Sequence, residues 1–190
     1  PVISNVTTGV AITPRTLTTT ASIGGTLTKV YDGSTRASGA SIVSSITGAV
    51  TGDTLRLDTS GITLAYNNAH VAAANKVIAT GSGTLAIASS ASSSVVGDYN
   101  FTAPVIADAT ASITPKALNA TASIGGALTK VYDGTVAATG ANIASTITGA
   151  VAGDTLSLNT SGITLAYNTA HVVTANKVTA SGSGTLAISS

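Results

Sequence analysis

Two histidines are the first candidates for chemistry in this chain. His70 and His171 are its only imidazoles, and they occupy equivalent places in two similar halves of the sequence. A catalytic or metal-binding histidine needs a second histidine or an acidic residue held nearby, and the flanking sequence offers neither. Each histidine follows a stretch containing asparagine, which is typical of a turn. The sequence therefore predicts a partly exposed histidine where a turn leads into a strand, with no catalytic residue and no enzymatic activity.

Three aspartates beside glycines are the next candidates. Asp32, Asp53 and Asp98 carry carboxylates, and clustered carboxylates can hold Ca²⁺ through their oxygens. The alternating acidic residues of a calcium-binding loop are absent from the sequence. We expect these aspartates to cap turns, with a weak calcium site between modules as the alternative. No other metal is expected.

A glycine-rich run could be read as a nucleotide-binding motif. The letters GSGTLA at residues 81–86, repeated at residues 182–187, fit the pattern G-x-G-x-x-A. That pattern binds a pyrophosphate only where the glycines open a helix, because the helix N-terminus supplies the positive potential. Here β-type residues follow the glycines. The run therefore predicts a turn between strands and no bound cofactor.

The composition narrows the classes of partner. The 190 residues carry a net charge of +1, and only 8% of them are charged while 44% are hydrophobic. Cysteine is absent, which excludes a disulfide framework and a thiol nucleophile. The basic residues form no stripe, so we expect no nucleic acid partner. No apolar run approaches the roughly 18 residues of a membrane-spanning helix, so we expect no membrane insertion.

A repeat of about 100 residues dominates the sequence. Residues 12–89 align on residues 113–190 without a gap, and most aligned positions are identical. The first copy of one segment reads ASIGGTLTKVYDG, and its second copy reads ASIGGALTKVYDG. A period of this length corresponds to a whole domain rather than to one turn of a solenoid.

The repeat suggests three segments. Residues 1–11 resemble the end of the first copy and would be the last strand of a preceding module. Residues 12–112 would form the first β-module. Residues 113–190 would form a second β-module that lacks its closing strand. The parent protein is expected to continue on both sides.

Short strands are expected throughout. Leu55 and Leu57 alternate with polar residues within residues 53–58, and glycine-rich turns separate such segments. One short helix is expected at residues 39–46, with a counterpart at residues 140–147. The pattern predicts an all-β fold of tandem β-sandwich-like modules, immunoglobulin-like or β-grasp-like. The proline at the junction predicts a semi-rigid joint and an elongated array.

Several motifs recur at matching spacing. They are Ile-Thr-Pro-Lys/Arg at residues 12–15 and 113–116, Lys-Val-Tyr-Asp-Gly at residues 29–33 and 130–134, Gly-Asp-Thr at residues 52–54 and 153–155, and Gly-Asp-Tyr-Asn-Phe-Thr-Ala-Pro at residues 97–104. On these motifs the sequence resembles the YDG-type and MBG-type repeats of filamentous-haemagglutinin-like bacterial adhesins. The resemblance implies tandem extracellular β-modules in the stalks of adhesins or biofilm-matrix proteins, without enzymatic activity in the repeat.

The Tyr-Asp-Gly signature needs its own interpretation. Its residues are Tyr31, Asp32 and Gly33 in the first copy and Tyr132, Asp133 and Gly134 in the second. A tyrosine of this kind could stack on a glycan. We instead expect a buried tyrosine that packs at the base of the module, with its hydroxyl bonded to the backbone.

Function follows from these expectations. We expect a structural repeat of a secreted bacterial surface adhesin or biofilm-matrix fibre, located at the cell surface, whose partners are neighbouring copies of the same module. The open edge of the second module favours polymerisation by strand addition. The donor residues would be Val2, Ile3, Val6, Val10 and Ile12. The alternative is an adhesive module that binds carbohydrate, such as surface glycans, or a host protein.

Overall fold

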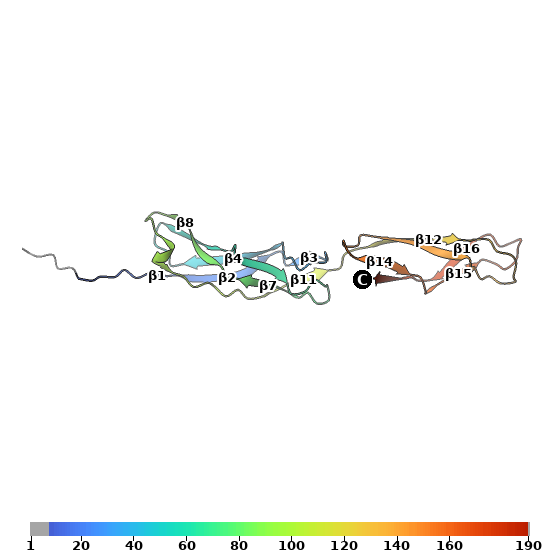
Figure 1. Cartoon of the computed structure of the whole chain (residues 1–190), viewed down its shortest axis with the longest axis horizontal. Coiled ribbons are helices and arrows are strands. Elements are labelled where there is room, and N and C mark those ends of the chain that lie inside the picture. Colours follow the sequence, from blue (N-terminus) through green and yellow to red (C-terminus); the bar gives the residue numbers. More distant parts are fainter. Residues whose placement is uncertain (1–7, 190) are drawn as a thin grey trace, which may run out of the picture. The chain divides into compact units, whose positions relative to one another are not determined.

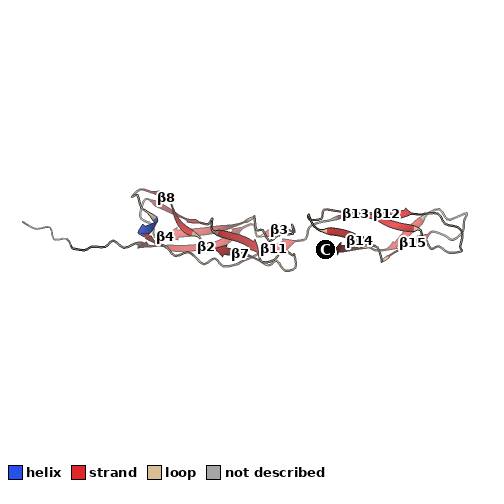
Figure 2. Ribbon diagram, viewed as in Figure 1, coloured by secondary structure: helices blue, strands red, loops and turns tan. Residues whose placement is uncertain are grey.

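The computed structural model describes residues 8–189 and separates the chain into two compact units, Pro1–Pro115 and Lys116–Ser190. Both units are built from β-strands, which confirms the expected all-β fold (Figure 2). The helical content of the described residues is one 3₁₀ turn, η1 (Val96–Asp98). None of the helical structure in that range has the length and apolar character to cross a membrane.

The strands of the two units correspond closely. In the first unit they are β1 (Arg15–Thr16), β2 (Thr18–Gly25), β3 (Thr28–Val30), β4 (Ala40–Thr47), β5 (Asp53–Asp58), β6 (Ile62–Tyr66), β7 (Lys76–Gly81), β8 (Thr84–Ser90), β9 (Tyr99–Asn100), β10 (Ala109–Thr110) and β11 (Ser112–Thr114). In the second unit they are β12 (Asn119–Gly126), β13 (Ala141–Thr148), β14 (Thr155–Asn159), β15 (Ile163–Tyr167), β16 (Val178–Gly182) and β17 (Thr185–Ser189).

Three antiparallel ladders form the frame of the first unit. β2 pairs with β4, β5 with β8, and β6 with β7. The last segment of the unit then adds to strands formed earlier in the chain. β9 lies parallel to β1, β10 lies antiparallel to β7, and β11 lies parallel to β3 (Figure 1). We call residues 97–114, which contain these three strands, the closing segment.

The second unit repeats the frame. β12 pairs with β13, β14 with β17, and β15 with β16. Within the described residues, this unit has no counterpart of β9, β10 or β11. Residues 129–131, which align with β3, do not form a strand here. Residues 116–189 thus show the same frame as the first unit.

Strand addition, expected from the sequence, stays a prediction. Of the donor residues, Val2, Ile3 and Val6 lie outside the described residues, and Val10 and Ile12 lie in residues 8–14, which form no strand here.

The helix expected at residues 39–46 and 140–147 is wrong, because both segments are strands. β4 pairs along eight residues with β2, and β13 pairs along eight residues with β12. In β4 the half-buried Ile42 and Ile46 lie on one face, and Val43 between them is exposed. This period of two, together with β-branched side chains, favours a strand. Alanine and serine between the β-branched residues obscured the alternation in the sequence.

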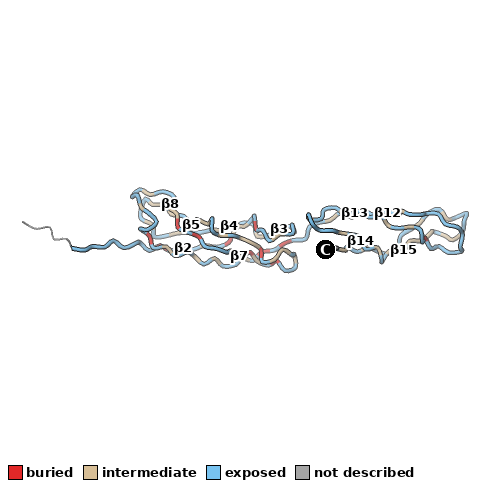
Figure 3. The backbone as a smooth tube through the Cα atoms, in the orientation of Figure 1, coloured by how far each residue is buried: buried red, intermediate tan, exposed pale blue. Residues whose placement is uncertain are grey.

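The buried residues of the first unit, red in Figure 3, form two small clusters. The larger cluster surrounds Val77, which is fully buried, and includes Tyr66 and Ile113. The smaller cluster consists of Leu17, Leu85 and Tyr99. In the described part of the second unit, Ala138 is the one buried hydrophobic residue. The closing segment thus contributes to both clusters of the first unit, through Tyr99 and Ile113.

The module boundary expected after residue 112 falls inside a strand. Ser112–Thr114 pair with Thr28–Val30 of the first unit, and the two units divide between Pro115 and Lys116. Ile113 is 3% exposed within the first unit. Because its side chain completes that core, β11 is the last strand of the first unit rather than the opening of the second.

Candidate functional site

Lys29 organises the signature loop that follows β3. Its Nζ lies 2.7 Å from Oδ1 of Asp32, 2.8 Å from the carbonyl oxygen of Ser34 and 3.1 Å from that of Arg36. The same ammonium lies 5.2 Å from the centre of the Tyr66 ring, within the range of a cation–π contact. The largely buried Lys29 ammonium therefore donates to three oxygens of the loop. Its contact with the Tyr66 ring holds the loop against β6.

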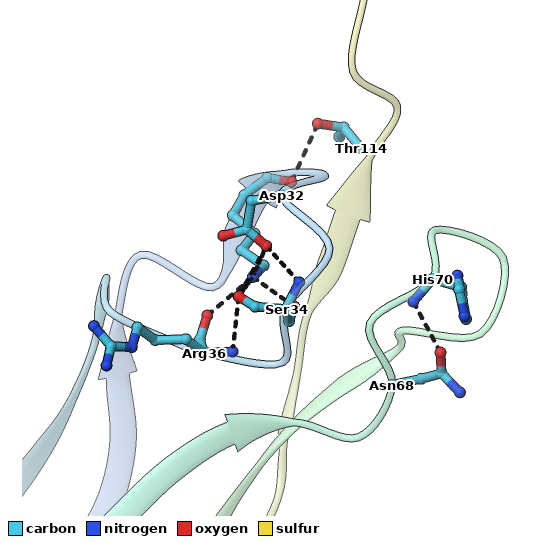
Figure 4. Close-up of polar contacts among 7 residues, drawn as sticks. Asp32, Ser34, Arg36, Asn68, His70 and Thr114 are labelled. Carbon is cyan, nitrogen blue, oxygen red and sulfur yellow. Dashed lines mark hydrogen bonds and ion pairs between the residues drawn. The ribbon is translucent and has the colours of Figure 1, made fainter. Parts of the chain in front are cut away.

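Asp32 caps the turn from the other direction. Its Oδ1 accepts hydrogen bonds from the backbone N–H and the hydroxyl of Ser34, both at 2.9 Å (Figure 4). Gly33 between them has a φ of 78°, which a side chain would disfavour. The bond from Lys29, followed by those from Ser34, lowers the pKa of Asp32 to about 2.

The second unit repeats this network. Nζ of Lys130 lies 2.7 Å from Oδ1 of Asp133, 2.9 Å from the carbonyl oxygen of Thr135 and 3.0 Å from that of Ala137. It also lies 5.5 Å from the centre of the Tyr167 ring. The signature is thus a structural network in both copies, and its polar groups bond to one another.

β3 and the signature loop also receive the closing segment in the first unit. The N–H of Ser112 donates to the carbonyl oxygen of Leu27, and that of Tyr31 donates to the carbonyl oxygen of Thr114. The hydroxyl of Thr114 donates to the carbonyl oxygen of Lys29 at 3.2 Å (Figure 4). The stretch that carries the signature is therefore also the edge on which β11 docks.

The two signature tyrosines lie in different surroundings. Tyr31 is half-buried and packs against the larger core cluster. Tyr132 is 61% exposed. Tyr31 is the less exposed of the two because the closing segment packs beside it in the first unit. The described part of the second unit has no counterpart of that segment. The buried tyrosines of the first unit are instead Tyr66, at 4% exposure, and Tyr99, at 6%.

The three candidate calcium aspartates bond in separate places. Asp32 caps the signature turn, and the side chain of Asp98 accepts from the N–H of Val95 at 2.9 Å. Asp53 accepts from the hydroxyls of Ser90, at 2.6 Å, and of Tyr99. These hydroxyls, Ser90 first, lower the pKa of Asp53. Residues 8–189 contain no group of three acidic, histidine or cysteine side chains that could hold a metal.

The histidines occupy exposed loops. His70 lies between β6 and β7, where its backbone N–H donates to Oδ1 of Asn68 at 2.8 Å (Figure 4). His171 lies in the matching loop, and its N–H donates to the hydroxyl of Thr169 at 3.3 Å. The turn is as expected, whereas the strand begins only at Lys76. Within residues 8–189, both histidines make their hydrogen bonds through backbone atoms.

The GSGTLA runs connect strands of different ladders, because β7 pairs with β6 while β8 pairs with β5. Gly81 ends β7 with a φ of 94°, and Thr84 opens β8. Gly182 and Thr185 repeat the arrangement in the second unit. A strand follows the glycines in both copies, so the helix N-terminus that a pyrophosphate requires is replaced by an extended chain.

Sequence reasoning missed the central lysine and its aromatic partner. The Lys-Val-Tyr-Asp-Gly motif contains Lys29 without assigning it a role, and none of the recurring motifs contains Tyr66. Both residues recur at equivalent positions in the second copy, and this recurrence is the signal that could have identified them. In each copy a lysine lies three residues before the aspartate, and a tyrosine ends the segment ITLAY.

Comparison with known families decides the relationship. A family model described as the YDG domain matches residues 13–106 and again residues 114–188. The chain belongs to the YDG domain family. No curated protein and no solved structure matches the chain.

Each unit is therefore a YDG domain, and the network gives the family signature a physical meaning here. The tyrosine, aspartate and glycine follow the strand that receives β11. The aspartate and the preceding lysine hold the loop in place. The signature of the first YDG domain thus joins the start of the domain to its end.

The pKa of Asp32 tests whether Lys29 and Asp32 form this hydrogen-bonded network. Replacing Lys29 by methionine removes the largest cause of the low pKa of Asp32, so that pKa should rise from about 2 towards its ordinary value of 3.8. The pKa of Asp133, also about 2, should stay unchanged because its partner is Lys130. Carboxyl-detected NMR titration measures both in one sample.

The sign of the accompanying stability change is fixed. A carboxyl with a lower pKa in the folded state binds fewer protons there than in the unfolded chain. Its stabilisation is complete above about pH 4 and is lost as the pH falls towards 2. In the Lys29→Met chain the part of this loss that the Lys29 bond causes should disappear, whereas the parts due to Ser34 and to the lowered pKa of Asp53 should remain. An Asp32 that titrates near 3.8 in the unsubstituted chain would contradict the network.

Proposed function

We propose that the chain is a structural repeat of an extracellular bacterial surface protein, an adhesin or a biofilm-matrix fibre, in which each YDG domain adds length. One observation carries this proposal. In the first unit, β1 and β11 lie at opposite ends of an elongated domain (Figure 1; Figure 2). The chain therefore passes from one end of that domain to the other, which suits a spacer.

The chemistry of the signature supports the same role. Lys29 and Asp32 bond to each other and to loop backbone, and the second copy does the same. These groups stabilise the domain rather than present charge to a ligand. A repeated unit whose polar signature groups bond to one another is typical of a scaffold.

Small-angle scattering tests the spacer role. In a series of chains with increasing numbers of consecutive YDG domains, the maximum dimension should grow in proportion to the number of domains. A maximum dimension that stops growing as domains are added would count against a spacer. Antibodies against the chain should label intact cells of the source bacterium, which tests the surface location.

A glycan array separates this role from an adhesive one. The proposal expects no glycan to retain the chain at micromolar concentration. Specific retention of one glycan class, removed by substitution of an exposed aromatic such as Tyr132, would favour a carbohydrate-binding module instead.

A further inference from the structure

Each copy of the signature contains an Asp-Gly pair, a sequence at which a protein backbone rearranges readily. All seven acidic residues of the chain are aspartates, and of these Asp32 and Asp133 alone precede a glycine. No asparagine precedes a glycine. Glycine has no Cβ to shield its nitrogen, so this nitrogen can approach the carboxyl carbon of the preceding aspartate. The two signatures are therefore the places in the sequence where this reaction meets the least steric hindrance.

The rearrangement passes through a cyclic imide. The backbone nitrogen of the glycine forms a bond to Cγ of the aspartate, and one carboxyl oxygen leaves as water with the amide proton and the proton of the carboxylic acid. Water then opens the ring. Opening at Cγ restores aspartate, whereas opening at the former backbone carbonyl gives isoaspartate, which adds one carbon to the backbone. Because the leaving oxygen must depart as water, the reaction starts from the protonated carboxyl group.

Three hydrogen bonds to one oxygen oppose this reaction in the first unit. Oδ1 of Asp32 lies 2.7 Å from Nζ of Lys29 and 2.9 Å from both the backbone nitrogen and the hydroxyl of Ser34 (Figure 4). Donors to a carboxylate favour its charged form over the acid. The same bonds fix the side chain, which must leave them before its Cγ can become the centre of a new ring.

Burial does not account for protection of this site. The side chain of Asp32 is 53% exposed, and Gly33 is exposed as well, so water reaches both. The side chain of Lys29, by contrast, is 17% exposed, and its ammonium is held by two loop carbonyls and lies 5.2 Å from the centre of the Tyr66 ring. The fixed lysine is therefore the part of the loop that can restrain the exposed aspartate.

The second unit contains the same arrangement. Oδ1 of Asp133 lies 2.7 Å from Nζ of Lys130 and 2.9 Å from both the backbone nitrogen and the hydroxyl of Thr135. The side chain of Asp133 is also 53% exposed. Threonine replaces serine here, and the hydroxyl donor is kept. All three donors thus recur around the second Asp-Gly pair.

We propose that the Asp32–Gly33 and Asp133–Gly134 peptide bonds are sites of isoaspartate formation, and that Lys29 and Lys130 slow this reaction by holding the aspartate side chains in hydrogen bonds. In the first unit the added carbon would directly follow Tyr31, whose N–H donates to the carbonyl oxygen of Thr114 in β11. The signature lysine therefore preserves the covalent structure of the edge on which β11 docks. The inference goes beyond the spacer role and does not depend on it.

Prolonged incubation of the whole chain at about pH 5 tests the proposal, because an ordinary aspartate is partly protonated there. A protease that cleaves before aspartate but not before isoaspartate, followed by mass spectrometry, measures the modification at each site. Lys29→Met should raise the rate at Asp32 at least about fivefold, since one unit of pKa changes the acid fraction about tenfold. The rate at Asp133 should not change in the same molecule, and Lys130→Met should reverse the pattern.

Lys76→Met is the matched control. Nζ of Lys76 also lies 2.7 Å from an aspartate oxygen, that of Asp108, but Asp108 precedes an alanine. This substitution removes one lysine–aspartate pair of the same length and should leave isoaspartate unchanged at both Asp108 and Asp32. Ser34→Ala removes the hydroxyl donor and keeps the backbone donor, so its effect at Asp32 should be smaller than that of Lys29→Met.

A synthetic peptide of residues 27–37 gives the rate without the fold. The unsubstituted chain should form isoaspartate at Asp32 at least about tenfold more slowly than this peptide. Protection of the Tyr31 amide from hydrogen exchange shows whether the Lys29→Met chain keeps its loop docked. If it does not, the peptide comparison decides, because it needs no substitution.

Two results would overturn the proposal. One is an unsubstituted chain that rearranges at Asp32 as fast as the peptide. The other is a folded Lys29→Met chain that rearranges no faster than the unsubstituted one. Both would leave the spacer role intact, because small-angle scattering tests that role separately.

Discussion

Replacing Ile113 by alanine should lower the free energy of unfolding of the first unit by about 2–5 kcal/mol. Ile113 is 3% exposed and lies in the cluster around Val77. Truncation leaves a cavity that the small core cannot refill easily, because β11 is fixed to β3 by backbone bonds. Denaturant-dependent hydrogen exchange of the β7 amides measures this change for the first unit alone.

Ile12 provides the matched control. It has the same side chain, precedes the same Thr-Pro pair and is 101% exposed. Ile12→Ala should change the stability of the first unit by no more than about 0.5 kcal/mol, measured on a dilute, monomeric sample. Equal losses from the two substitutions would mean that β11 does not complete the core.

Replacing Gly81 by alanine should destabilise the first unit by at least about 3 kcal/mol. A Cβ at this position would lie 1.9 Å from the carbonyl oxygen of Gly61, which belongs to the backbone of the paired hairpin. The φ of Gly81 is 94°, and an alanine at this φ would add backbone strain because its Cβ disfavours a positive φ. The hairpin of β6 and β7, which carries Tyr66 and Val77, would have to shift.

Thermal unfolding followed by circular dichroism checks this expectation. The transition of the first unit should fall by more than about 10 °C. Gly97→Ala is the control, because a Cβ there meets nothing within 4 Å and no positive φ is involved. Gly182→Ala should reproduce the effect in the second unit, where the same contact is 2.0 Å. A Gly81→Ala chain as stable as the Gly97→Ala chain would contradict the close approach.

The frame of each unit could be predicted from local patterns. Alternation within residues 53–58 indicated β5, and the glycines of GSGTLA indicated the turn before β8. The period-two signal failed at residues 39–46, where serine and alanine replace larger side chains on one face. The alternation of apolar and polar residues therefore predicted a strand only where the two faces of that strand differ in polarity.

Partner choice could not be predicted in the same way. Nothing in the alternation of Thr28–Val30 says that its partner is Ser112–Thr114, because pattern encodes the face of a strand and not its neighbour. The role of Lys29 also depends on a loop that brings two carbonyl oxygens and the Asp32 carboxylate around one ammonium. The duplicated Lys-Val-Tyr-Asp-Gly marked the place without revealing the geometry.

The pairing of β3 with β11 has a consequence for biosynthesis. It joins residues 84 positions apart, as in the contact of the Thr28 and Ser112 hydroxyls. Because synthesis starts at the N-terminus, β3 cannot pair with β11 until nearly the whole domain has been synthesised. Such distant contacts slow folding to about milliseconds or seconds. The core of the first unit is therefore completed only after residues 112–114 have been synthesised.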